Sequence, residues 1–176
     1  MEIDCPSSCV HLKTGRSYES TRKLPDHNMV ARARSVRETF LSEYGPILEA
    51  LGRAVAEERY ASPWLVDLDV LEVYRALAAT MKTLSSGLYY ETLPESPGKI
   101  ALFRKLKEIL DGLMSPGDAQ HRTLRVSEAL EILDFLMLSF AANTSDRPKS
   151  RQYLDWLCAM TGVAPPPPES TRLIIP

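Results

Sequence analysis

Apolar side chains recur along this chain at steps of three and four residues, the spacing that places them on one face of an α-helix. Five segments show this pattern, and clusters of proline, glycine and serine separate them. No segment of comparable length alternates apolar and polar residues as a half-buried strand would. The sequence therefore predicts an all-α protein, an antiparallel bundle of four to five helices. The predicted helices cover approximately residues 28–60, 63–86, 97–114, 124–142 and 148–160.

Proline and glycine suggest where these helices begin, bend and end. Ser62-Pro63 and Ser96-Pro97 each resemble a helix start, with serine as the cap and proline at the first helical position. Gly87 is placed to end the second helix, because glycine tolerates the left-handed conformation of a C-terminal cap. Gly162 is placed to end the fifth helix in the same way. Gly45-Pro46 falls inside the first helix, where proline predicts a kink or a break.

Two features of the pattern bear on how the helices pack. The 124–142 segment is apolar around most of its circumference, which is typical of the central helix of a bundle. Asp67, Asp69 and Glu72 lie at the first turns of the second helix, where negative charge complements the helix dipole. We therefore expect the fourth helix at the centre and assign these three acids a purely local structural role.

The two ends of the chain do not share the helical pattern. Residues 1–27 are predicted to form a basic N-terminal extension, with a turn or a short hairpin between Cys9 and Tyr18. Residues 28–162 form the predicted bundle domain. Residues 163–176 form a proline-rich tail in which Pro165–Pro168 must be extended as polyproline II. The tail then reaches the apolar residues Leu173, Ile174 and Ile175.

Composition fits one globular domain inside a cell. Of the 176 residues, 44% are apolar and 25% are charged, which is ordinary globular usage. The acidic start of the chain does not resemble a secretory signal, and no apolar stretch is long enough to span a bilayer. Three cysteines are too few for a secreted disulfide framework. The expected location is the cytoplasm, with no membrane partner.

The first residues contain the most suggestive metal-binding pattern. Cys5 and Cys9 are four positions apart, with His11 close by and His27 further along the chain. Thiolate and imidazole are the ligands that zinc prefers, so a zinc or iron–sulfur site is one interpretation. A second cysteine pair is missing, although Cys158 could supply another ligand. We favour reduced thiols in a turn, with no cofactor expected.

A basic segment precedes and opens the first helix. Arginine suits phosphate because its planar guanidinium donates two hydrogen bonds at once. The segment carries no interleaved aromatic residues for base stacking, and no helix-turn-helix pair accompanies it. A solvated basic face is therefore the favoured interpretation, and phosphate or nucleic-acid binding is the alternative. The candidate anion-binding residues are Arg22, Lys23, Arg32, Arg34 and Arg37.

Two segments have the character of protein-interaction surfaces. The connection between the second and third helices contains Tyr89 and Tyr90 between leucines, for which we favour capping of a bundle end, with contact to a ligand or partner as the alternative. In the tail, the proline run holds Leu173, Ile174 and Ile175 away from the last helix. Exposed apolar groups of this kind normally find cover, in the same chain or in another.

Signatures of catalysis are missing from the sequence. It has no Gly-x-Ser-x-Gly, phosphate loop or dinucleotide fingerprint, and no Glu-x-x-His for a di-iron bundle. Whether the protein is an enzyme is uncertain, and the sequence leans against it. We expect a non-enzymatic adaptor or regulatory protein that acts through protein–protein contacts. A protein partner or a second copy is favoured over nucleic acid.

Overall fold

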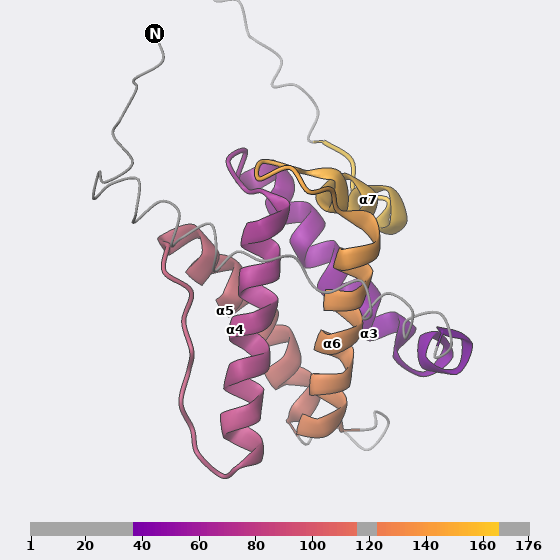
Figure 1. Ribbon diagram of the computed structural model, residues 1–176. Helices are drawn as coiled ribbons and strands as arrows, with labels where there is room; N and C mark the ends of the chain where they lie inside the picture. The colour runs from indigo at the N-terminus through magenta and orange to yellow at the C-terminus, as the bar shows by residue number, and fades with distance from the viewer. Residues whose placement is uncertain (1–36, 116–122, 166–176) are drawn as a thin grey trace, which may run out of the picture.

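A computed structural model describes residues 37–115 and 123–165, and it contains five α-helices with no strand in those ranges (Figure 1). The all-α prediction is therefore confirmed for the described chain. The predicted N-terminal extension and most of the tail lie outside the described residues. The helices, labelled as in Figure 1, are α3 (Arg37–Ala61), α4 (Asp67–Ser85), α5 (Pro97–Met114), α6 (Val126–Asn143) and α7 (Gln152–Thr161).

The centre of the bundle is α4, which packs against both α5 and α6 (Figure 1). Its buried residues lie on most sides of the helix, from Val70 and Leu71 to Leu77 and Met81. The prediction that the 124–142 helix would be central is wrong. That helix, α6, buries one face and leaves Phe135 and other apolar side chains half-buried. Apolar content alone did not distinguish a central helix from one with a second, partly covered apolar face.

Several predicted helix boundaries are confirmed. The hydroxyl of Ser96 accepts a hydrogen bond from the Lys99 N–H, and Pro97 is the first residue of α5. Gly87, with φ of 76°, ends α4 in a Schellman motif. The Leu88 N–H donates to the Thr83 carbonyl there, and the Gly87 N–H donates to that of Leu84. Gly162 has φ of 68° and follows α7 in the same left-handed conformation.

Helix α3 continues through Pro46 without a break. A residue before proline is normally hindered in the helical region, because its Cβ clashes with the proline ring. Gly45 has no Cβ, which relieves that clash and lets the helix pass. The sequence predicted either a kink or a break at Gly45-Pro46, and the continuous helix rules out the break.

The predicted start of the second helix at Ser62-Pro63 is wrong. The Ser62 hydroxyl donates to the Glu58 carboxylate in the last turn of α3, so it does not cap a new helix. Residues 62–66 form a turn that places Leu65 in the core, fully buried. Helix α4 begins four residues later than predicted, at Asp67, and the Asp69 carboxylate accepts a hydrogen bond from the Val66 N–H at 3.1 Å.

One pair of neighbouring helices departs from the predicted antiparallel order. Helices α4 and α5 run in the same direction, and residues 86–96 return along the outside of the bundle to connect them (Figure 1). The ion pairs agree with this direction. Lys99, near the start of α5, meets Glu72 at 2.7 Å and Asp69 at 3.9 Å near the start of α4. The sequence showed the length of the connection but not its direction.

The buried carboxylate of Asp67 joins α4 to the start of α7. Asp67 is 1% exposed, and its oxygens accept hydrogen bonds from the backbone N–H groups of Tyr153 and Leu154, both at 3.1 Å. They also accept from the hydroxyls of Ser150 at 2.6 Å and Thr144 at 3.1 Å. In return the Asp67 N–H donates to the Ser150 carbonyl at 2.9 Å. Asp67 therefore caps α7, a role beyond the local one assigned from sequence.

Replacing Asp67 with alanine should destabilise the protein by about 3 kcal/mol, because four donors lose a charged acceptor and some stay buried without a partner. Urea unfolding measures this loss. Asp146→Ala, at an exposed position in the same connection, serves as the matched control and should change stability by less than about 0.5 kcal/mol. Equal effects of the two changes would contradict the capping role of Asp67.

A pair of buried tyrosines lies beneath this cap. The Tyr74 and Tyr153 hydroxyls are 3.2 Å apart, and both residues are fully buried. Their rings meet edge to face, with centroids 6.4 Å apart. Burial raises the pKa of Tyr74 well above its usual range, and burial together with the charge of an ionised Tyr74 raises the pKa of Tyr153. Both phenols therefore stay protonated in the folded protein at pH values where exposed tyrosines ionise.

The protein should lose stability as the pH rises above 10, the ordinary tyrosine pKa. The unfolded chain then releases protons that folded Tyr74 and Tyr153 retain, which costs up to about 1.4 kcal/mol per pH unit for each tyrosine. Urea unfolding at pH 9 to 11 measures the slope. A Tyr74→Phe/Tyr153→Phe variant should flatten it, whereas Tyr90→Phe at an exposed position should not. An unchanged slope in the double variant would show that Tyr74 and Tyr153 do not cause the loss of stability at high pH.

Candidate protein-interaction surfaces

Most of the candidate ligands predicted from sequence lie outside the described residues. These are Cys5, Cys9, His11 and His27 for a metal, and Arg22, Lys23, Arg32 and Arg34 for an anion. Arg37 is the first residue of α3, but its side chain is not described. The apolar tail residues Leu173, Ile174 and Ile175 are also outside these ranges. All of these sites stay predictions.

Cys158 is the candidate metal ligand whose position is described. It is 8% exposed on α7, and its thiol lies 3.9 Å from the Ala56 carbonyl of α3. Within the described ranges, no three side chains of His, Cys, Asp or Glu are grouped so as to hold a metal ion. Cys158 is thus buried between α7 and α3.

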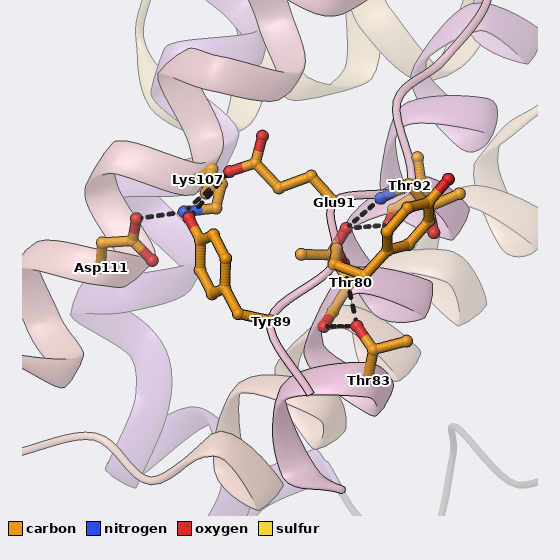
Figure 2. Close-up of polar contacts among 9 residues, drawn as sticks. Thr80, Thr83, Tyr89, Glu91, Thr92, Lys107 and Asp111 are labelled. Atoms are coloured by element: carbon orange, nitrogen blue, oxygen red, sulfur yellow. Dashed lines mark hydrogen bonds and ion pairs between the residues drawn. The ribbon is translucent and has the colours of Figure 1, made fainter. Parts of the chain in front are cut away.

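The tyrosine pair predicted as a contact surface lies on the crossover between α4 and α5. We call Leu88–Leu93 the tyrosine loop. Two threonines of α4 hold its backbone (Figure 2). The one hydrogen of the Thr83 hydroxyl is shared between the Tyr90 carbonyl at 2.9 Å and the Thr80 carbonyl at 2.8 Å, and the Thr92 N–H donates to the Thr80 hydroxyl at 3.0 Å. Thr80 is 3% exposed and itself donates to the Ala76 carbonyl at 3.0 Å, so its orientation is fixed.

Charged side chains hold the other side of the loop. Lys107 of α5 lies between Glu91 of the loop at 3.5 Å and Asp111 at 2.5 Å (Figure 2). Its ammonium also lies 5.6 Å from the centre of the Tyr89 ring, a cation–π contact. Burial alone would lower the pKa of Lys107, but the hydrogen bond and charge of Asp111 and the contact with Tyr89 outweigh it and raise the pKa. The Tyr89 hydroxyl donates to Glu91 at 3.0 Å.

The side chains of the tyrosine loop face solvent although its backbone is held in place. The exposed fractions are 66% for Leu88, 71% for Tyr89, 69% for Tyr90 and 46% for Leu93. Such exposure argues against the expectation that the rings cap an end of the bundle. The cause is the path of the crossover, which runs along α4 and places the tyrosines over the side of the bundle. The loop is thus an ordered surface with four exposed apolar or aromatic side chains.

A second apolar surface was not predicted from the sequence. Helices α3, α6 and α7 enclose an open groove of about 270 Å³, which we call the α3–α6–α7 groove. Its lining is mostly apolar and includes Leu41, Leu48, Phe135, Trp156 and Met160. Leu41 is 43% exposed and Met160 is 67% exposed, so they form its open rim. The half-covered apolar face of the 124–142 helix was the available signal.

None of the described helices is long and apolar enough to cross a membrane. Comparisons of the chain with protein-family models, with curated proteins and with solved structures found no match.

Replacing Thr80 with valine should loosen the tyrosine loop, because the Thr92 N–H loses its acceptor. A net hydrogen bond is worth about 1 kcal/mol, so amide exchange at Thr92 should accelerate by roughly fivefold or more. Ser85→Ala is the matched control: the Ser85 hydroxyl also bonds a backbone carbonyl of α4 but does not touch the loop. Exchange at Thr92 that is the same in both variants would show that Thr80 does not hold the loop.

Proposed function

We propose that this protein is a non-enzymatic adaptor or regulatory module that binds a protein partner through the tyrosine loop. The observation that carries the proposal is the combination of a fixed backbone and exposed side chains at Leu88–Leu93. Threonines 80 and 83 and the Glu91–Lys107 contact hold the loop before any partner arrives. Binding then loses little conformational entropy, which favours affinity.

The chemistry of the loop indicates the kind of surface it would bind. Tyrosine is enriched among the residues that dominate binding energy, because its ring buries a large area while its hydroxyl seeks a hydrogen bond. Leu88 and Leu93 extend the apolar area on both sides of the tyrosines. A fitting partner offers an apolar depression with hydrogen-bond acceptors at its edge. Lys107 is engaged by two carboxylates, so attraction between opposite charges contributes little.

Affinity capture from cells of the native host, using the full chain as bait, tests the proposal. Tyr90→Ser should reduce recovery of the partner by at least about tenfold, because truncating a central interface tyrosine often costs 2 kcal/mol or more. Tyr90 is 69% exposed, so the change should leave the fold intact. Quantitative mass spectrometry of the captured proteins gives the measurement, and urea unfolding confirms that stability is retained.

Met160→Ser is the control for loss of exposed apolar area, since Met160 is 67% exposed but belongs to the α3–α6–α7 groove. It should leave recovery unchanged. Recovery should also change little with salt, whereas nucleic-acid binding through all five candidate basic residues would weaken by roughly 500-fold between 50 and 200 mM salt. Full recovery with Tyr90→Ser, or recovery that collapses with salt, would reject the tyrosine loop as the binding surface.

A further inference from the structure

The α3–α6–α7 groove leaves apolar side chains of three helices incompletely covered. Its volume of about 270 Å³ lies just below the range of roughly 300–1,000 Å³ that is usual for small-molecule sites. A cavity of about 150 Å³ can hold one benzene, so this groove has room for one or two aliphatic side chains. The size and the mostly apolar lining therefore favour side chains of a peptide segment over a polar ligand.

We infer that Leu173, Ile174 and Ile175 of the tail dock in the α3–α6–α7 groove of the same chain. The proposal concerns a surface distinct from the tyrosine loop and does not depend on the function proposed for that loop. Three adjacent aliphatic residues match the apolar lining. Glu49 on the groove wall already pairs with Arg53 at 2.8 Å, so the fit rests on the apolar side chains and not on the charge of Arg172.

The length of chain beyond the last described residue makes this docking feasible. Thr161, the last residue of α7, lines the groove, and the described chain continues to Pro165. Polyproline II carries the chain roughly 9 Å from Pro165 to Pro168, and the five steps from Pro168 to Leu173 can span up to roughly 16 Å, enough for the chain to turn back. Packed helices such as α3 and α7 lie about 8–10 Å apart, so the aliphatic residues can return to the groove they leave.

The basic segment before α3 is a poorer occupant of the same groove. Residues 22–37 include Arg22, Lys23, Arg32, Arg34 and Arg37, and their one apolar run, Met29-Val30-Ala31, is followed directly by Arg32. Burying charge beside Leu41 and Phe135 would be costly without partners. Connection to α7 also gives the tail an effective concentration in the millimolar range, so even weak apolar contacts suffice to hold it.

Fluorescence of Trp156, which lines the groove, tests the docking. The chain has two tryptophans, and Trp64→Phe leaves Trp156 as the sole emitter. In that full-length background, a Leu173→Ser/Ile174→Ser/Ile175→Ser variant should make Trp156 more accessible to acrylamide. The variant removes the one or two aliphatic side chains that the groove can hold, which should shift the docked-to-open ratio by at least about tenfold. The Met160→Asp change in the groove rim should have the same effect with the natural tail.

Matched controls separate docking from a general loss of apolar surface. Leu88→Asp replaces a side chain of the tyrosine loop that is about as exposed as Met160. It should leave the accessibility of Trp156 to acrylamide unchanged. A synthetic peptide of residues 169–176, added at millimolar concentration to the serine variant, should restore protection, and its triple-serine counterpart should not. Methyl NMR of Met160 in chains that keep both tryptophans gives a second readout that does not need Trp64→Phe.

Two results would overturn the inference. Equal accessibility of Trp156 and an unchanged Met160 methyl signal with natural and serine tails would show that the tail does not enter the groove. Protection that increases with protein concentration would show that the tail of a second copy occupies it. Either result leaves the tyrosine loop untouched, because that surface is tested by capture of a partner with Tyr90→Ser.

Discussion

The position of α7 depends on one buried carboxylate. Helix α7 has ten residues and no capping hydrogen bond from its own N-cap side chain, and isolated helices of that length are marginal in water. Asp67 supplies the missing acceptor from the start of α4, and the negative charge complements the dipoles of both helices. Since α7 provides Trp156 and Met160 to the α3–α6–α7 groove, the shape of that groove also depends on Asp67.

The sequence predicted the elements of this fold better than their arrangement. Ser96, Gly87 and Gly162 mark helix ends through hydrogen bonds or backbone angles that involve near neighbours, so local reasoning found them. Ser62 failed as a cap because its hydroxyl binds Glu58 and Leu65 is drawn into the core. Those causes depend on the packed structure. The central place of α4 and its parallel alignment with α5 depend on it in the same way.

The candidate surfaces were likewise only partly predictable, because the sequence shows the residues but not how packing exposes them. Tyr89 and Tyr90 could be selected from the sequence because their rings and the nearby leucines give the connection both apolar surface and polar tips, but their exposure follows from the crossover path. For the groove, the sequence signalled only one wall, the apolar face of the 124–142 helix, since the other walls come from helices distant along the chain. Leu41, Phe135 and Met160 each read as ordinary core residues until packing leaves them at a shared edge.

The crossover between α4 and α5 also restricts how the chain can vary. Residues 86–96 span up to roughly 36 Å when extended, and the path along α4, whose helix is about 28 Å long, uses most of that reach. A deletion of a few residues there would pull the start of α5 away from Glu72 and Asp69, whereas an insertion would only bulge outward. Evolution can therefore lengthen this connection more easily than it can shorten it.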